Sequence, residues 1–146
     1  MCTAHKILLV DDDLGDTELT SEYLQASSPN IELFAVQDGV EALRFLRREG
    51  EFDEAFRPDL ILLDLNMPRK DGRELLHDIR QDPALDLIPV VVFTTSDAPE
   101  DVRRVYRSGG NAYVTKPASL TDFAATIQSI KNFWLDVAQL PQDKSS

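Results

Sequence analysis

Acidic, hydroxyl and amine side chains stand at the ends of four short apolar runs of the sequence. They are Asp11, Asp12, Asp13, Asp64, Thr94, Thr95, Ser96 and Lys116. If these runs are neighbouring parallel strands, their carboxyl ends meet at one edge of a sheet, where open α/β folds bind their ligands. The acids, hydroxyls and lysine would then converge on one site.

Charge limits what such a site could do. Carboxylates about 5 Å apart at an effective dielectric constant near 20 repel by roughly 3 kcal/mol, so three of them need a cation or raised pKa values. Mg²⁺ fits, because it favours a few carboxylates, water and a phosphate oxygen. A carboxylate held beside Mg²⁺ can attack phosphorus and form an acyl phosphate. Lys116 would add positive charge around the phosphoryl group, and the Thr94 hydroxyl could hydrogen-bond the product.

Five strand-like runs would place these side chains. They cover residues 6–10, 31–36, 60–64, 89–94 and 112–115. The third and fourth runs are continuously apolar, which is typical of strands buried on both faces of a parallel sheet.

Helix signals separate these runs. Four of the expected helices have residues at their start that favour helix initiation. These residues are Asp38, Asp71, Pro99 and Ser119. Asp38 and Glu41 have the spacing of a capping box, and a further helix is expected near residues 14–25. Strand and helix thus alternate five times, which predicts a three-layer α/β domain with right-handed crossovers.

Composition is typical of a folded, acidic protein of one domain. The chain has 146 residues, 42% of them hydrophobic, and its 26 acidic and 15 basic side chains give a net charge of −11. A phosphate backbone repels a surface of this sign, so direct nucleic-acid binding is not expected. No apolar run approaches the roughly 18–20 residues of a membrane helix. With Cys2 as its one cysteine, the chain can form no internal disulfide, and the cytoplasm is the expected compartment.

Several motifs at the strand ends resemble those of a known family. They are Val10-Asp11-Asp12, Leu62-Leu63-Asp64-Leu65-Asn66-Met67-Pro68, Asp71-Gly72, Val92-Phe93-Thr94-Thr95 and Tyr113-Val114-Thr115-Lys116-Pro117. Over residues 5–135 the chain resembles the receiver domains of two-component response regulators. The resemblance implies a flavodoxin-like, three-layer (βα)5 fold whose five-stranded parallel sheet has the order 2-1-3-4-5. Residues 136–146 would form a C-terminal tail that is too short for a second domain.

The resemblance also implies a metal site and a phosphorylation site. Asp64 matches the phosphoacceptor, and Asp11 and Asp12 match the acidic pair that binds Mg²⁺ together with Asp64. The backbone carbonyl of Asn66 matches a further ligand of the metal. Asp13 is then expected to be exposed or to cap the first helix.

Three further residues match family residues that bind the phosphoryl group or change conformation in response to it. Lys116 matches the phosphate-binding lysine, Thr94 the switch hydroxyl, and Tyr113 the aromatic residue whose rotamer follows Thr94. One position departs from the pattern, because the residue after the switch threonine is usually Ala or Gly and here is Thr95. Its larger side chain could narrow access to the phosphoryl group and change the lifetime of the phosphorylated state.

The function implied by the resemblance is that of a single-domain response regulator. It would accept a phosphoryl group from a sensor histidine kinase and pass the signal on through a surface change, without acting as an enzyme on an external substrate. A narrower resemblance, to the regulators paired with bacterial phytochromes, rests on residues 57–66, on Thr94-Thr95-Ser96 and on Phe133-Trp134-Leu135. It implies a bacteriophytochrome as the partner kinase.

A homodimer is expected, with the fourth helix, fifth strand, fifth helix and tail as its interface. Apolar side chains on these elements exceed what one helix face needs for the core. They are Val102, Val105, Tyr106, Tyr113, Phe133 and Trp134. Leu140 and Pro141 of the tail could extend the contact. The alternative is a monomer in which Phe133 and Trp134 close its own core.

Two other function classes fit parts of the pattern. An aspartyl-phosphate phosphatase or phosphotransferase would use the same Mg²⁺ chemistry, but it commonly has a second acid two residues after the nucleophile, where this chain has Asn66. A flavodoxin-like FMN module would need a Ser/Thr/Gly-rich loop after the first strand, where this chain has three acids. Turnover of a phosphomonoester would favour the phosphatase, and a single stoichiometric phosphorylation would favour the receiver.

Overall fold

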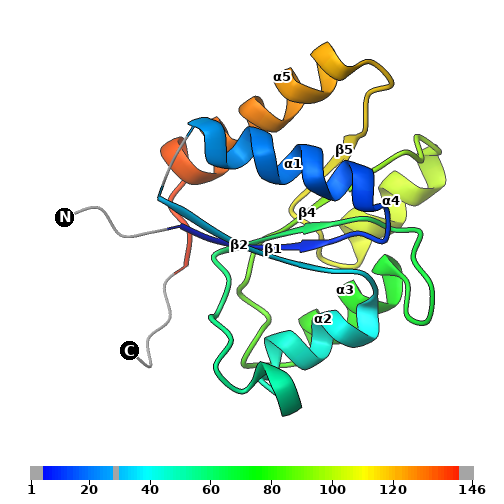
Figure 1. The fold of residues 1–146 in the computed structure, drawn as a ribbon. Coiled ribbons are helices and arrows are strands. Elements are labelled where there is room, and N and C mark those ends of the chain that lie inside the picture. Colours follow the sequence, from blue (N-terminus) through cyan, green and yellow to red (C-terminus); the bar gives the residue numbers. More distant parts are fainter. Residues whose placement is uncertain (1–4, 28–29, 142–146) are drawn as a thin grey trace.

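Five parallel strands form the middle layer of the computed structural model, which describes residues 5–27 and 30–141 (Figure 1). They are β1 (His5–Val10), β2 (Ile31–Val36), β3 (Leu60–Leu63), β4 (Val90–Thr94) and β5 (Ala112–Thr115). Their order in the sheet, β2-β1-β3-β4-β5, confirms the predicted topology. Cys2 and residues 142–146 of the predicted tail lie outside the described residues.

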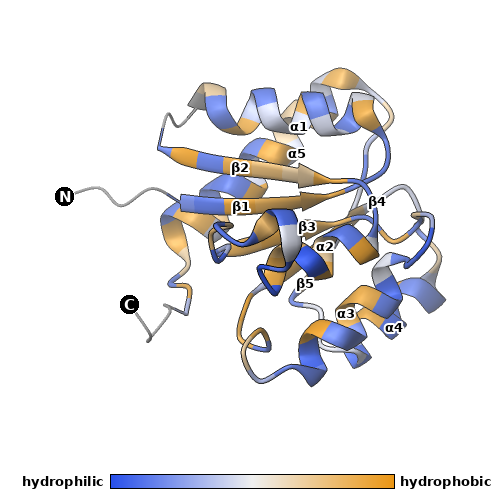
Figure 2. Cartoon of the chain, turned by 60° about the horizontal axis from the view of Figure 1, so that its bottom comes forward, coloured by the Kyte–Doolittle hydropathy of each residue, from blue (hydrophilic) through white to orange (hydrophobic). Residues whose placement is uncertain are grey.

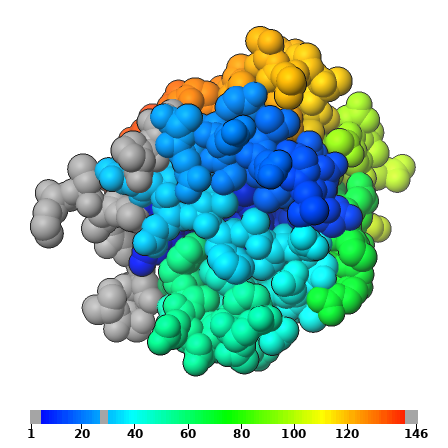
Figure 3. Space-filling view, in the orientation of Figure 1, coloured from blue at the N-terminus to red at the C-terminus, as the bar shows by residue number. Residues whose placement is uncertain are grey.

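Five helices form the two outer layers. They are α1 (Leu14–Ser27), α2 (Gly39–Leu46), α3 (Gly72–Gln81), α4 (Pro99–Arg107) and α5 (Leu120–Lys131). The apolar side chains of α1 and α5 share one core cluster, and those of α2, α3 and α4 share the cluster on the other face of the sheet. Figure 3 shows α1 in blue and α2 in cyan over much of one face, with α5 in orange above α1. Among the described residues, no helix is long and apolar enough to span a lipid bilayer.

Two helix starts illustrate how local sequence fixes the ends of the elements. Asp71 accepts a hydrogen bond from the Glu74 N–H at 3.0 Å, and the Glu74 side chain accepts one from the Asp71 N–H, which completes a capping box at α3. Asp38 likewise accepts from the Glu41 N–H at 2.8 Å at the start of α2. The carboxylate of Glu41, however, accepts from Gln37 instead of Asp38, so only half of the expected box is present there.

The sheet is buried most completely at β3 and β4. Every residue of these two strands is buried, as their continuous apolar runs predicted. Their side chains alternate between the two core clusters, so that Leu62 packs on the α1 and α5 side while Leu63 packs on the other. Figure 2 shows these strands as hydrophobic between helices of mixed hydropathy. Burial on both faces makes the middle strands a rigid support for the residues that follow them.

The apolar residues expected on the surface of α4, β5 and α5 divide between core and surface. Val105 is 1% exposed and belongs to the core, so the expectation that it supplies surface was wrong. The reason is helical spacing, which turns Val105 toward the sheet while Tyr106 remains 52% exposed. Phe133 is 53% exposed, on a π-helical extension of α5 (Asn132–Val137) where Trp134 packs partly against the core.

A glycine lets α3 start directly against the end of β3. A Cβ atom on Gly72 would lie 2.3 Å from the carbonyl oxygen of Asp64 and 2.8 Å from the Cα of Leu65. The Gly72 N–H donates to the Leu65 carbonyl at 2.9 Å. Only glycine permits this approach, which fixes the short connection that carries Asp64.

Candidate functional site

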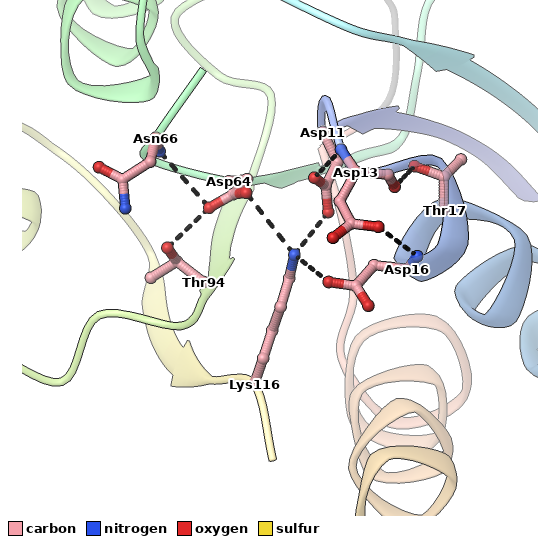
Figure 4. Close-up of polar contacts among 8 residues, drawn as sticks. All are labelled: Asp11, Asp13, Asp16, Thr17, Asp64, Asn66, Thr94 and Lys116. Carbon is pink, nitrogen blue, oxygen red and sulfur yellow. Dashed lines mark hydrogen bonds and ion pairs between the residues drawn. The ribbon is translucent and has the colours of Figure 1, made fainter. Parts of the chain in front are cut away.

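The strand register brings the predicted site residues to one edge of the sheet (Figure 4). Val10 pairs with Leu63, so Asp11 and Asp64 follow at neighbouring positions, and the Asp64 N–H donates to the Val10 carbonyl at 2.9 Å. On the other side, the Lys116 N–H donates to the carbonyl of Thr94 at 2.7 Å. Backbone hydrogen bonds therefore hold the acids, the hydroxyl and the lysine next to one another.

Three carboxylates form a cluster that could hold a metal ion. Asp11, Asp12 and Asp64 each offer an oxygen atom within 4.8 Å of the other two. Their donor set consists of oxygen alone, which fits Mg²⁺ or another hard divalent cation, and such a cation would relieve their mutual repulsion. The Asn66 N–H lies 3.5 Å from Asp64 Oδ1, so this residue also borders the cluster. Asp13 is exposed and accepts from the Asp16 N–H at 3.0 Å, as expected of a cap on the first helix.

Lys116 lies among carboxylates and is almost completely buried. Its Nζ atom is 2.7 Å from Asp11, 2.9 Å from Asp16 and 3.6 Å from Asp64, and its side chain is 3% exposed. Nζ also lies 5.8 Å from the centre of the Phe93 ring. Lys116 is therefore held as an ammonium group directed at the acid that follows β3.

The pKa values of the two strongest partners reflect this arrangement. Burial raises the pKa of Asp11 to about 6, although the hydrogen bond from Lys116 works in the opposite direction. Burial alone would lower the pKa of Lys116, but its hydrogen bonds to Asp11 and Asp16 outweigh burial and raise the pKa above its usual value. The lysine thus remains charged at neutral pH.

Asp64 is held through both of its oxygen atoms. Thr94, which is fully buried, donates its hydroxyl to Asp64 Oδ1 at 2.7 Å. The other oxygen, Oδ2, faces the Lys116 ammonium at 3.6 Å. The carboxylate therefore presents one oxygen that a neutral donor occupies and one that lies in a field of positive charge.

Tyr113 lies on β5, and its side chain contacts the loop that follows β4. Its hydroxyl donates to the backbone carbonyl of Ser96 at 2.7 Å, and burial raises its pKa. The Ser96 hydroxyl donates to Asp101 at 2.6 Å, and Arg73 of α3 donates to the same carboxylate at 2.9 Å. The loop between Thr94 and α4 is thereby bonded to α4 and to β5, and α4 is in turn bonded to α3.

Two features of this site have no distinct signal in the amino-acid sequence. Asp16 reaches Lys116 from the first turn of α1, where an acid is usual because of the helix dipole, so its presence gave no separate signal. The bonds of Asp101 to Ser96 and Arg73 depend on how α3 and α4 lie against each other. Residue spacing along the chain does not contain that information.

Comparisons with known proteins identify the family and several similar chains. Residues 7–128 match the family model of the response regulator receiver domain. The response regulator Rcp1 of Synechocystis sp. is 47% identical over 135 residues, which cover 92% of each chain.

Two solved structures are similar over nearly the whole chain. One is the phosphorylated cyanobacterial phytochrome response regulator RcpA, with a TM-score of 0.93 and 46% identity, covering 96% of this chain and 100% of that one. The other is the Mn²⁺-bound form of Rcp1, with a TM-score of 0.90 and 46% identity, covering 94% of this chain and 99% of that one.

The bonds of Asp101 predict a pH-dependent contribution to stability. Hydrogen bonds from Ser96 and Arg73 lower its pKa in the folded state, so the folded protein binds this proton less readily than the unfolded chain. We expect Asp101→Asn to lower the free energy of unfolding by about 1 kcal/mol at pH 7. The difference from the parent protein should shrink as the pH falls through the lowered pKa. Urea unfolding at several pH values measures this difference in the free energy of unfolding.

Glu100→Gln is the control for this comparison. Glu100 is exposed and also lies in the first turn of α4, so both substitutions remove one charge from the same helix end. Equal losses in the two variants, or a loss at Asp101 that does not change with pH, would contradict the prediction.

Proposed function

The chain belongs to the response regulator receiver family, and on that premise we propose that it is a single-domain regulator that a sensor histidine kinase phosphorylates on Asp64. Residues 5–135 are the receiver domain in this proposal, and residues 136–146 are the tail. The observation that carries the proposal is the convergence of Asp64 with Asp11, Asp12 and Lys116 at one edge of the sheet.

Asp64 is the nucleophile in this proposal. Its Oδ1 atom accepts the Thr94 hydroxyl, which leaves Oδ2, beside Lys116, as the atom that attacks phosphorus. A bond from Oδ2 to phosphorus forms while the bond from phosphorus to the donor's leaving atom breaks, and the leaving group departs with the electron pair. Mg²⁺ would be held by Asp11, Asp12, Asp64 and the Asn66 carbonyl, and would neutralise charge on the phosphoryl oxygens. Lys116 adds its positive charge on the same side.

The signal leaves the site through Thr94 and the loop after it. A phosphoryl group on Asp64 offers new acceptor oxygens to the Thr94 hydroxyl, which now donates to Asp64. The residues that follow Thr94 lead to Ser96, whose carbonyl accepts the Tyr113 hydroxyl. A move of Thr94 would therefore reach β5 and α4 through this loop. Thr95, which is exposed between Thr94 and Ser96, is positioned to affect access to the phosphoryl group.

The proposed partner is the histidine kinase of a bacterial phytochrome. The support is the similarity to Rcp1 and to RcpA, which is described as a cyanobacterial phytochrome response regulator. The protein would catalyse only its own phosphorylation and dephosphorylation, and would bind neither nucleic acid nor membrane.

We also propose a homodimer formed through α4, β5, α5 and the tail. An open groove of about 620 Å³ lies between β5 and α5 with its extension, lined in part by Val114, Ile130, Phe133 and Trp134. Phe133 leaves half of its side chain exposed, so the chain's own core does not use it fully. The same apolar face on a second copy would cover this groove in a symmetric contact.

Phosphorylation should occur on Asp64 alone. Incubation with acetyl phosphate and Mg²⁺ should add one phosphoryl group to the parent protein and none to Asp64→Asn, because the amide is not a nucleophile of comparable strength. Intact-mass spectrometry measures the product. Labelling of the variant to the same extent would overturn the assignment, and sustained turnover of p-nitrophenyl phosphate by the parent protein would favour the phosphatase alternative.

Metal binding should depend on Asp12 and not on Asp13. Asp12→Ala removes one of three clustered carboxylates, and we expect the affinity for Mg²⁺ to fall by about tenfold or more. Asp13→Ala removes an equal charge from the next residue, whose carboxylate caps α1, and should have little effect. Isothermal titration calorimetry distinguishes the two. A larger effect at Asp13 would show that the metal ligands are assigned one residue too early.

The dimer should depend on Phe133. Light scattering at micromolar concentration should give a dimer mass for the parent protein and a monomer mass for Phe133→Asp, because the variant places a charge in an apolar contact. Leu14→Asp is the control, since Leu14 is 62% exposed at the start of α1 and does not line this groove, and it should stay dimeric. A monomeric parent protein, with and without phosphorylation, would refute the proposed interface.

A further inference from the structure

Lys116 has a carboxylate partner that does not belong to the metal cluster. This partner is Asp16, from the first turn of α1. We infer that Asp16 is a positioning residue, which holds the Lys116 ammonium in place for the phosphoryl group. The inference rests on the proposed function, because it concerns how the same site is kept ready for phosphorylation.

The two acids on either side of the ammonium come from different layers of the fold. Figure 4 shows Asp16 reaching Nζ from α1 and Asp64 reaching it from β3, on opposite sides of the lysine. The distance is 2.9 Å to Asp16 and 3.6 Å to Asp64. Asp16 therefore holds Lys116 more closely than the nucleophile does.

Asp16 is itself fixed by its backbone. Its N–H donates to Asp13 Oδ1 at 3.0 Å, and the next residue, Thr17, donates both its N–H and its hydroxyl to the Asp13 carbonyl. The Asp16 side chain is 27% exposed, so water can solvate the oxygen that does not face Lys116. An acid held in this way is ready to bind the lysine without a change in the loop.

A carboxylate outside the metal cluster could hold Lys116 while the cluster binds a metal ion. Asp11 lies 2.7 Å from Lys116, but it is also one of the three carboxylates grouped for a metal ion. A divalent ion there would compete with Lys116 for Asp11 and would repel the ammonium group. Asp16 does not share this conflict, and it can keep the lysine in position when Asp11 turns to the ion.

Lys116 has enough N–H donors to bond to Asp11, Asp16 and Asp64 at the same time. An ammonium group has three N–H donors and accepts none. Asp11 and Asp16 take one donor each. The third can be directed at Asp64, and at a phosphoryl oxygen once Asp64 is modified. Helix-dipole stabilisation alone would favour an acid in the first turn of α1, but it does not require contact with a buried lysine one hundred residues away in sequence.

The test compares Asp16→Asn with Asp13→Asn. Both variants remove one negative charge from the same turn and keep an oxygen acceptor, but only Asp16 contacts Lys116. We expect Asp16→Asn to slow phosphorylation by acetyl phosphate at saturating Mg²⁺ by about tenfold, the scale on which outer partners of a site act. Asp13→Asn should stay within about twofold of the parent rate, and both variants should bind Mg²⁺ with similar affinity.

A double-mutant cycle separates positioning from a structural role. In a Lys116→Ala background, Asp16→Asn should have almost no further effect on the rate, because the group that it positions is gone. Thermal unfolding followed by circular dichroism reports whether each variant is folded, and Asp16→Ser provides a second variant if Asp16→Asn is unstable.

Two results would overturn the inference. One is an Asp16→Asn rate equal to or above that of Asp13→Asn, and the other is a full additive loss in the Lys116→Ala background. A parent protein that acetyl phosphate does not label at all would instead refute the proposed function, so the two failures are distinguishable.

Discussion

Charge compensation at one edge of the sheet is the constraint on which the site depends. The carboxylates of Asp11, Asp16 and Asp64 contact the ammonium group of Lys116, and Asp12 lies close to Asp11 and Asp64. Each pair of carboxylates about 5 Å apart repels by roughly 3 kcal/mol at an effective dielectric constant near 20, so one lysine cannot balance them all. Burial adds to this cost, which is why the pKa of Asp11 rises to about 6 even with a lysine at hydrogen-bond distance. The folded protein is thus short of positive charge where a divalent cation would supply it.

The residues at this edge could be predicted from the sequence because the carboxyl ends of neighbouring parallel strands lie at the same edge of a sheet. The second and fifth strands have the predicted bounds, Ile31–Val36 and Ala112–Thr115, and the pairing of Val10 with Leu63 follows from two apolar runs that end in acids. The third strand was predicted one residue too long. It ends at Leu63, since the chain turns immediately afterwards so that α3 can start against it, with the Gly72 N–H bonded to the Leu65 carbonyl. Full burial on both faces leaves a strong composition signal, and that signal was present in the middle strands.

Contacts between side chains of separate elements could not be predicted in the same way. The contact of Asp16 with Lys116 joins residues from α1 and the end of β5, and it depends on the distance and rotation of the helix relative to the sheet. The same is true of Arg73 and Asp101, which lie on α3 and α4. Even a local motif was incomplete, because the Glu41 carboxylate bonds to a backbone N–H one residue earlier than a capping box requires. Periodicity and motif spacing specify which face a residue lies on, but they do not specify which polar partner it selects there.

The bonds around the loop after β4 explain how one modified carboxylate could alter a distant surface. Thr94 has a single hydroxyl hydrogen, which Asp64 now accepts, so a stronger acceptor on Asp64 can take it only by turning the threonine. Ser96, two residues later, is held at its carbonyl by Tyr113 and at its hydroxyl by Asp101. These bonds are either made or broken, and the strands beneath the loop are closely packed, so the loop has few intermediate positions to occupy. A small displacement at Asp64 would therefore be converted into a discrete rearrangement of α4 and β5, where Tyr106 of α4 is exposed.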